Sequence, residues 1–358
     1  MISICEESHI FDVHIFVTGM HLSKKFGYTV DEVYKSNFKN VIKFNNTKSG
    51  VGMDLSLANT IRGFSKVIKQ IRPDLVVIHG DRVEALAGAI TSSLRNVLVA
   101  HIEGGEVSGT IDELIRHAVS KVSHAHFVAN DIAKKRLIQL GELPKSIYVI
   151  GSPDLDLIEA SKAPDITKIK DHYGIDFKEY AIALFHPVTT EVNMLRKQAK
   201  VFVRALVESN KNYILIYPNN DFGHEFIIEE YKELTRNKSF KIFPSIRFEY
   251  FLSLLNHSEF IIGNSSAGIR EAPYLNLPSI DIGSRQKNRH FYEGIIRCDF
   301  NKNQILDAIS KTKSVKARIQ KHSIKDFGDG KSAKKFFRVL KSKSFWQIKN
   351  QKQFQDLQ

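Results

Sequence analysis

Short apolar segments rich in β-branched residues alternate with helix-like segments along most of this chain of 358 residues. Between two of them, apolar residues recur every three or four positions from Leu57 to Ile71, which predicts a helix with one buried face. Gly and Asp residues at the segment ends indicate short turns between strand and helix. The alternation therefore predicts an α/β fold with parallel sheets covered by helices.

The alternation stops at the polar stretch 161–165 and then starts again, which predicts two Rossmann-like domains. We expect an N-terminal domain at 1–160, a second domain at 166–335, and a helical extension at 336–358 that packs back on the first domain. A chain of this length suits two domains of ordinary size. The strands that we expect are 13–18, 40–44, 75–79, 97–102, 125–128 and 148–150, then 181–185, 213–217, 241–243, 260–262 and 279–282.

The composition excludes several classes of protein. With 42% hydrophobic and 25% charged residues, the chain is typical of soluble globular proteins. No apolar run approaches the roughly 20 residues needed to span a membrane, and the first residues do not resemble a signal peptide. Two cysteines make no disulfide framework. We therefore expect a cytoplasmic protein with no membrane partner.

The net charge of +13 is concentrated near the C-terminus. Between Lys311 and Lys349 there are 13 Lys and Arg residues against two acids. Such a stretch fits a surface that binds nucleic acid or anionic membrane, or a solvated helical face whose positive field attracts an anionic substrate. No recognised nucleic-acid motif accompanies the charge, so we favour the second interpretation and expect no nucleic-acid partner.

Three acidic segments in the first half indicate a catalytic site. HGDR at 79–82 and HIEGGE at 101–106 directly follow apolar strands, and SGTIDE at 108–113 opens the next helix. Open α/β sheets bind ligands at such strand ends, and neighbouring carboxylates can act as general base and general acid. Each acid alone is better explained as a helix cap, but three on one rim favour catalysis. The candidates are Asp81, Glu103 and Asp112.

The second half carries a candidate nucleotide site. The loop GNSSAGIRE at 263–271 leads into a helix, so backbone N–H groups and Ser hydroxyls can bind a phosphate. Glu271 can accept both hydroxyls of a ribose, and GSRQKNR at 283–289 supplies cations. His186 in FHPVTTE follows another strand and suits either a phosphate contact or a capping role. Ordinary helix capping by Ser is the alternative for the loop.

One motif has the spacing of a metal site, but we do not expect it to bind a metal. Asp154 and Asp156 have the D-x-D spacing that binds metal in some glycosyltransferases. They follow Gly-Ser-Pro at the start of an expected helix, where capping by the carboxylates is the better explanation. No other acidic or histidine cluster has clear metal-ligand spacing. We expect no metal and no cofactor.

Together these segments resemble the hydrolysing UDP-N-acetylglucosamine 2-epimerases of bacterial sialic-acid pathways. The resemblance rests on six motifs in order, HGDRVEALAGA, HIEGGEVSGTIDELIRHA, GSPDLD, FHPVTTE, FPSIRFEYF and GNSSAGIREAP with GSRQKNR. It implies a glycosyltransferase-B-like fold of two Rossmann-like domains with a C-terminal crossover helix. It also implies elimination of UDP to a 2-acetamidoglucal, followed by hydration to free N-acetylmannosamine.

The resemblance also assigns roles to residues. It makes Asp81, Glu103 and Asp112 the catalytic carboxylates, without deciding which is base and which is acid, and it places His186 near the diphosphate. Arg116 lies four residues after Asp112 on one helix face and can orient it. The implied substrate-binding residues are Arg82, Arg116, Asn219, Ser265, Ser266, Glu271 and Arg285.

The chain departs from the family at its N-terminus. Family members begin with a strand and a Thr-Gly-Thr-Arg loop, and no such segment precedes 13–18. Either the start codon is assigned too late or the protein is truncated. If it is truncated, we expect a strand to be missing from the middle of the first sheet, with low stability or weak activity. Three alternatives stay open: the same reaction on UDP-2,4-diacetamido-2,4,6-trideoxyglucose, a UDP-sugar glycosyltransferase, or an inactive UDP-sugar-binding remnant. The family also suggests a homodimer or homotetramer.

Overall fold

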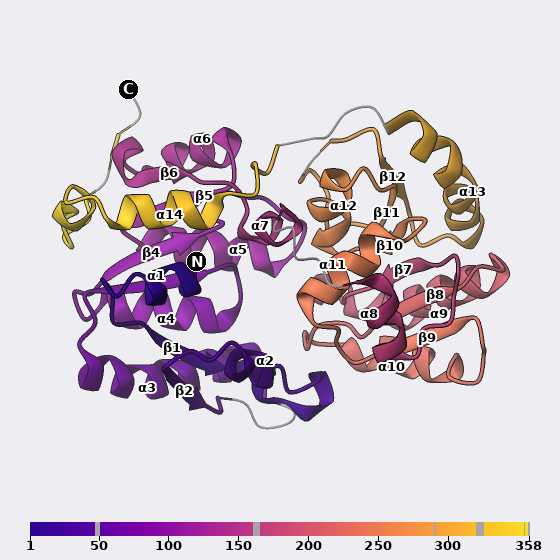
Figure 1. Ribbon diagram of the computed structural model, residues 1–358, viewed down its shortest axis with the longest axis horizontal. Coiled ribbons are helices and arrows are strands. Elements are labelled where there is room, and N and C mark those ends of the chain that lie inside the picture. The colour runs from indigo at the N-terminus through magenta and orange to yellow at the C-terminus, as the bar shows by residue number, and fades with distance from the viewer. Residues whose placement is uncertain (47–50, 160–164, 290, 320–325, 354, 357–358) are drawn as a thin grey trace. The chain divides into compact units, whose positions relative to one another are not determined.

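The computed structural model describes residues 1–46, 51–159, 165–289, 291–319, 326–353 and 355–356, and they form two units (Figure 1). The first unit combines Met1–Val107 and Ile111–Asp156 with the C-terminal segment Asp326–Gln358. The second unit comprises Ser108–Thr110 and Leu157–Lys325. The expected linker at 161–165 lies outside the described residues except for Asp165.

The first unit is built mainly from βα repeats. Its strands are β1 (His14–Thr18), β2 (Asn40–Phe44), β3 (Leu75–His79), β4 (Leu98–Ile102), β5 (Ala125–Val128) and β6 (Ile147–Val149). Its helices are α1 (Ile2–Glu7), α2 (Val30–Lys35), α3 (Met53–Ile71), α4 (Val83–Ser93), α5 (Ile111–Val122), α6 (Asp131–Gln139), α14 (Ser332–Leu340) and, at its boundary with the second unit, α7 (Pro153–Glu159).

The strands of the first unit do not form the single sheet that the alternation predicts. β3, β4, β5 and β6 form one parallel sheet in that order, while β1 and β2 form a separate parallel pair. Val77 of β3 is 43% exposed, whereas every residue of β4 is buried. A parallel strand that is covered on both faces is apolar throughout, so β3 lacks cover on one face.

Side chains hold the β1–β2 pair to the rest of the first unit. Asn46, just after β2, is buried and accepts a hydrogen bond from the Gly19 N–H at 3.0 Å. Its side-chain amide donates to Thr60 at 2.8 Å and to Glu84 at 3.1 Å. Phe16 of β1 packs against Phe64 of α3 with ring centroids 4.8 Å apart. Apolar packing and one buried amide therefore connect the pair to α3 and α4.

The second unit contains one continuous parallel sheet in the order β12-β11-β10-β7-β8-β9. Every residue of the four inner strands is buried, while the edge strands β9 and β12 are partly exposed. The strands are β7 (Ala181–Leu184), β8 (Tyr213–Ile216), β9 (Phe240–Phe243), β10 (Ile261–Gly263), β11 (Ser279–Ile282) and β12 (Ile295–Cys298). The helices are α8 (Ile166–Tyr173), α9 (Val192–Glu208), α10 (His224–Glu233), α11 (Phe248–Asn256), α12 (Glu271–Tyr274) and α13 (Lys302–Ile319).

The C-terminal segment returns to the first unit, where α14 lies beside α1 (Figure 1). Phe336 of α14 packs against Phe127 of β5, with ring centroids 4.7 Å apart. The Asp156 carboxylate accepts hydrogen bonds from the N–H groups of Ser332 and Ala333 at 2.8 and 2.7 Å. Asp156 therefore caps α14, a contact that satisfies N–H groups with no partner inside that helix.

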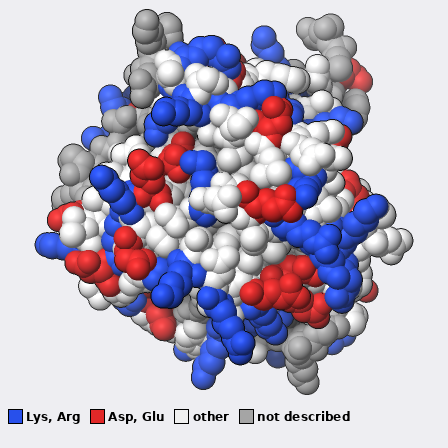
Figure 2. Space-filling model, turned by 90° about the vertical axis from the view of Figure 1, so that its right-hand side faces the viewer, with Lys and Arg blue, Asp and Glu red and all other residues white. Residues whose placement is uncertain are grey.

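The basic C-terminal stretch begins on a helix whose charges are partly paired. On α13, Lys302 pairs with Glu208 at 2.8 Å and Lys311 with Asp307 at 2.6 Å. Figure 2 shows basic and acidic side chains interspersed over one face of the molecule. Such mixing is typical of a solvated protein surface. Among the described residues, no helix is long and apolar enough to cross a bilayer.

Candidate active site

The carboxyl ends of β3 and β4 bring two of the predicted acids to neighbouring positions in the first unit. The strands pair in parallel with His79 opposite Ile102, and the Gly80 N–H donates to the Ile102 carbonyl at 3.1 Å. Asp81 follows Gly80 and Glu103 follows Ile102, so both acids leave the same edge of the sheet. This is the edge at which parallel sheets bind their ligands.

Arg116 holds the Asp81 carboxylate. It projects from α5, its side chain is only 2% exposed, and its guanidinium pairs with Asp81. A second guanidinium nitrogen donates to the Glu106 carbonyl at 3.2 Å. Arg116 thus binds Asp81, while its expected role in orienting Asp112 stays a prediction. The guanidinium therefore ties the Asp81 carboxylate and the Glu106 carbonyl to α5.

Glu103 is held in an unusual backbone conformation. Its φ is +68°, in the left-handed region that few residues other than glycine occupy, and the residue is 8% exposed. One carboxylate oxygen accepts a hydrogen bond from the Ser152 hydroxyl at 3.1 Å, and the other lies 3.4 Å from His79 Nε2. Strained backbone of this kind persists where surrounding contacts enforce it, and it clusters at functional sites.

The remaining predicted residues of the first unit lie at helix starts. Asp112 is in the first turn of α5, four residues before Arg116, and is 6% exposed. Arg82 is the residue that precedes α4. Since Arg116 binds Asp81, the helix that carries Asp112 is attached directly to the end of β3. The structure thus brings Asp81 and Arg116 of α5 together, with Glu103 just after the adjacent strand.

In the second unit, Asn264 connects the predicted binding residues. Its side chain accepts a hydrogen bond from the His186 N–H at 2.7 Å and donates to the His186 carbonyl at 2.8 Å. Its own carbonyl accepts from Gln286 at 2.9 Å and from Arg285 at 3.3 Å. Asn264 is 1% exposed. It therefore fixes the loop after β7 against the loops after β10 and β11.

The same network determines which nitrogen of His186 carries the proton. The Asn219 N–H donates to His186 Nδ1 at 3.1 Å, so Nδ1 is an acceptor. The neutral ring then carries its proton on Nε2, which can donate to an anion. The Asn219 side chain donates to Asp221 at 2.6 Å. His186 and Asn219 are thus brought together through Nδ1.

The loop after β10 has the form expected for anion binding. Ser265 accepts a hydrogen bond from the Ala267 N–H at 3.3 Å, and Ser266 begins the short helix Ser266–Gly268. Gly263 has a φ of +138°, and a Cβ there would lie 1.9 Å from the Leu184 carbonyl, so only glycine fits. Glu271, at the start of α12, is 2% exposed. Free N–H groups at such a turn favour a phosphate.

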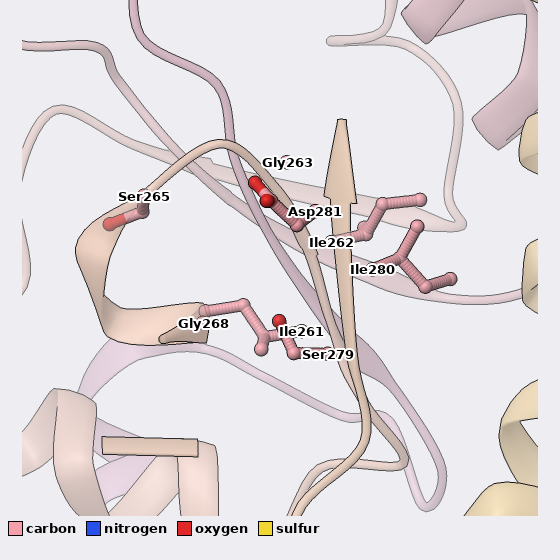
Figure 3. Close-up of a pocket in the computed structure, with 8 residues that line it drawn as sticks. All are labelled: Ile261, Ile262, Gly263, Ser265, Gly268, Ser279, Ile280 and Asp281. Atoms are coloured by element: carbon pink, nitrogen blue, oxygen red, sulfur yellow. The ribbon is translucent and has the colours of Figure 1, made fainter. Parts of the chain in front are cut away.

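A narrow pocket lies between this loop, β10 and β11 (Figure 3). Asp281 lines it near the end of β11, and burial raises the pKa of Asp281 to about 6 despite the nearby Arg297 and Arg285. The other lining residues are Ile261, Ile262, Gly263, Ser265, Gly268, Ser279 and Ile280. Among the described residues, no group of three or more His, Cys, Asp and Glu side chains has the geometry of a metal site.

Comparisons with known proteins agree with this arrangement. A family model described as UDP-N-acetylglucosamine 2-epimerase matches residues 3–341. The chain is 46% identical to the UDP-N-acetylglucosamine 2-epimerase of Neisseria meningitidis serogroup B, covering 97% of this chain and 92% of the relative. The chain belongs to the UDP-N-acetylglucosamine 2-epimerase family. This confirms the family that the six sequence motifs predict.

The chain also resembles a second curated protein and a solved structure. The chain is 34% identical to the hydrolysing UDP-N,N'-diacetylbacillosamine 2-epimerase of Legionella pneumophila, covering 94% of this chain and 89% of the relative. Among solved structures it resembles Methanocaldococcus jannaschii UDP-GlcNAc 2-epimerase in complex with UDP-GlcNAc and UDP. That likeness has a TM-score of 0.80 at 24% identity, covering 95% of this chain and 94% of that one. It confirms the expected α/β fold with two Rossmann-like domains.

Four residues that matter to this geometry were not singled out in the sequence. Asn264 connects three loops, Ser152 holds Glu103, and Asp281 is a buried acid beside the phosphate loop. His101 contacts the Gly80 carbonyl at 3.0 Å. Only the place of Asn264 inside the Gly/Ser-rich loop motif indicated a binding role, although His101 and Ser152 also lie inside motifs. The roles of the others depend on contacts between residues far apart in the sequence.

Proposed function

We propose that this protein is a hydrolysing UDP-N-acetylglucosamine 2-epimerase that supplies N-acetylmannosamine for sialic or related nonulosonic acids. The observation that carries the proposal is the set of acids at neighbouring strand ends, with Asp81 and Glu103 held by Arg116 and Ser152. The 46% identity to the Neisseria enzyme supports the same substrate. The proposed substrate is a UDP-sugar, and no cofactor enters the reaction.

The reaction needs two proton transfers at one carbon. In the first step the bond from C1 to the UDP oxygen breaks and C2 loses its proton, giving UDP and a 2-acetamidoglucal. In the second step water adds its oxygen to C1, while C2 gains a proton on the opposite face. A carboxylate can take the first proton, and a carboxylic acid can supply the second. We assign these steps to Asp81, Glu103 and Asp112 jointly.

The second unit suits the departing UDP. We propose that Ser265, Ser266 and His186 bind the diphosphate, because a proton on His186 Nε2 and the N–H groups of the turn can stabilise the charge that develops on it. Glu271 would accept the ribose hydroxyls. Asn219 and Arg285 would contact the rest of the nucleotide, and Arg82 would contact the sugar end.

A second candidate uses the same chemistry on UDP-2,4-diacetamido-2,4,6-trideoxyglucose. The 34% identity to the Legionella enzyme favours it, and the higher identity to the Neisseria enzyme favours UDP-N-acetylglucosamine. Incubation with each sugar nucleotide, followed by UDP release and NMR of the free sugar, separates them. We expect free N-acetylmannosamine from UDP-N-acetylglucosamine and turnover at least tenfold slower with the other nucleotide. UDP binding without turnover of either would support an inactive remnant.

We also propose that the protein works in the cytoplasm as a homo-oligomer. The family resemblance supports both statements. Light scattering during size-exclusion chromatography tests the oligomeric state, and we expect the mass of a dimer or a tetramer. A monomer at the concentration of the activity assay would contradict it.

A further inference from the structure

The C-terminal tail caps the helix that carries Arg116. The Lys352 ammonium donates to the carbonyl oxygens of Lys121 and Ser123, both at 2.7 Å, and to that of Ser120 at 3.3 Å. These carbonyls lie at or just beyond the C-terminal end of α5, where helix carbonyls have no partner within the helix. A cation is also favoured there by the helix dipole. Lys352 therefore supplies hydrogen-bond donors to the carbonyl groups at the end of α5, although it lies 231 residues after Lys121 in the sequence.

A buried anion holds Lys352 in place. Glu142, whose side chain is 1% exposed, accepts a hydrogen bond from Lys352 at 2.6 Å and lies 3.0 Å from His126 Nε2. Burial alone would raise the pKa of Glu142, but the hydrogen bonds from His126 and Lys352 outweigh burial and lower it. The ionised carboxylate thus faces the ammonium. Removing Lys352 would leave Glu142 with His126 and with Lys121, whose ammonium lies 3.3 Å from its other oxygen, and the loss of one partner from a buried ion pair is costly.

Asn350 attaches the tail at a second point. The Val99 N–H donates to His124 Nδ1 at 3.0 Å, so His124 Nε2 carries the proton and donates to the Asn350 carbonyl at 3.0 Å. The Asn350 side chain donates to the Asn96 carbonyl at 2.5 Å. Val99 belongs to β4, the strand that Glu103 directly follows. The tail is therefore bound to the strand as well as to the helix.

A chain of hydrogen bonds runs from the end of α5 to the turn that carries Asp81. His101 Nε2 lies 3.0 Å from the Gly80 carbonyl, and His101 Nδ1 lies 2.9 Å from the Ser120 hydroxyl. A carbonyl only accepts, so Nε2 carries the proton and the Ser120 hydroxyl donates to Nδ1. Burial lowers the pKa of His101 to about 3, which keeps the ring neutral and in this one tautomer.

Asp81 is thus held from two directions by α5. The carbonyl of Gly80, the residue before Asp81, is held through His101 and Ser120. The Asp81 carboxylate is held by Arg116. Gly80 has a φ of +81°, a conformation that glycine adopts without steric cost. A movement of α5 relative to the sheet would displace both attachments.

We propose that residues 350–352 form a latch, the C-terminal latch, that positions α5 and, through Ser120, His101 and Arg116, the carboxylate of Asp81. Lys352 and His101 are positioning residues in this scheme, because neither needs to touch the substrate. The functional consequence rests on the proposed function. The contacts of the latch do not depend on it.

The first test compares Lys352→Met with Lys349→Met, a control that removes an exposed charge three residues away. Lys352→Met should lower kcat about tenfold and leave the Kd for UDP within about twofold, because displacing a reacting group by a fraction of an ångström costs rate rather than ground-state binding. Lys349→Met should change neither. Lys352→Arg, which keeps a cation, should recover most of the rate. An unchanged kcat in Lys352→Met would overturn the proposal.

The second test asks whether the latch acts through His101. Ser120→Ala removes the hydroxyl and keeps the carbonyl that Lys352 binds, so the two contacts can be broken separately. If Lys352 and Ser120 both act on the turn at 80–82, their effects on activity should not be independent. The fold-loss of activity in the double variant should then be at least threefold smaller than the product of the two single fold-losses, as for coupled residues. Losses that simply multiply would contradict a common path. His101→Gln, which keeps an N–H donor, should be more active than His101→Leu.

Hydrogen exchange separates failure of the latch from failure of the proposed function. In Lys352→Met, amides at the end of α5 and at 80–82 should exchange faster, while those of β7 and β8 should not change. This readout holds even if the wild-type protein releases no UDP, an outcome that would refute the proposed function alone. Unchanged exchange at 80–82 in Lys352→Met would refute the latch, whatever the activity.

Discussion

The two units place different chemistry at the carboxyl ends of their strands. In the first unit these ends carry acids that are held by an ion pair and a hydroxyl, as for Asp81 with Arg116 and Glu103 with Ser152. In the second unit they carry amide, hydroxyl and imidazole groups joined through Asn264. Acids suit proton transfer, while neutral donors suit an anion. The difference suggests that one unit performs the chemistry and the other binds the nucleotide.

The units also differ in how their sheets are completed. The inner strands of the second unit are buried throughout, so backbone pairing and apolar packing suffice to position the loops. In the first unit the sheet breaks between β1 and β3, and one face of β3 is partly exposed. There, the Asn46 side chain helps to connect the β1–β2 pair to α3 and α4, which a continuous sheet would not require. Substitutions of polar residues should therefore disturb the first unit more widely.

The largest effect should come from Asp81→Asn. The change removes a carboxylate but keeps its shape, so we expect kcat to fall about 1,000-fold, within the range for loss of a general acid or base. The Kd for UDP should stay within about twofold if the second unit binds the nucleotide. UDP release and calorimetric titration measure the two quantities.

Asp74→Asn is the matched control for Asp81→Asn. Asp74 is exposed and lies at the opposite end of β3. Its substitution should leave kcat unchanged. Loss of UDP affinity in Asp81→Asn, with normal turnover, would reverse the division of roles between the units.

The complementary change in the second unit is Asn264→Ala. It removes both hydrogen bonds that the Asn264 side chain makes with the His186 backbone, at a cost of about 2 kcal/mol, equivalent to about a thirtyfold weaker Kd for UDP if the loops lose their geometry. Saturating UDP-sugar should restore most of kcat. The exposed Asn303 on α13 gives the control, Asn303→Ala. Normal UDP binding by Asn264→Ala would show that the network is structural only.

The next largest effect is on the pH dependence of stability. The pKa of His101 falls from 6.5 unfolded to about 3 folded, so below pH 6.5 the unfolded state binds the additional proton. Folding stability should therefore fall with decreasing pH by at most about 1.4 kcal/mol per unit. His101→Gln should reduce the difference in Tm between pH 7.5 and pH 5. An identical difference in both proteins would mean that His101 is charged or absent from the folded network.

The smallest predicted effect concerns the cap of α14. Asp156→Ala removes acceptors for two N–H groups at the start of that helix, and such a cap contributes about 1 kcal/mol. Faster hydrogen exchange should be limited to the first turn of α14 and its neighbours in the first unit. Exchange that spreads into the strands of the second unit would show that the units do not unfold separately.

The parts of the fold that could be predicted from sequence were those with continuous apolar patterns. Buried strands such as β5 and β11 were predicted within one residue, because both faces of each strand are covered. β12 was missed, since it is a short edge strand interrupted by the partly exposed Arg297. The break between β1 and β3 does not follow from the alternation, which describes elements and not their pairing.

The candidate site was predictable where a motif concentrates chemistry at a strand end, as at Asp81, Glu103 and Ser265. The partners of those residues were not. Ser152, Lys352 and the hydrogen bonds of His101 come from segments 19 to 232 residues apart in the sequence. Periodicity in a single sequence does not predict contacts between residues so far apart. Arg116 shows the limit, because helix spacing indicates a neighbour such as Asp112 on the same helix but not its ion pair with Asp81 at the end of a strand.

The reaction in D₂O tests the central claim most directly. With UDP-N-acetylglucosamine as substrate, proton removal at C2 and later hydration must exchange that hydrogen with solvent. The account predicts one equivalent of UDP and free N-acetylmannosamine with one deuterium at C2, detected by NMR and mass spectrometry. A product that retains its C2 proton, or a sugar that stays linked to UDP, would contradict it.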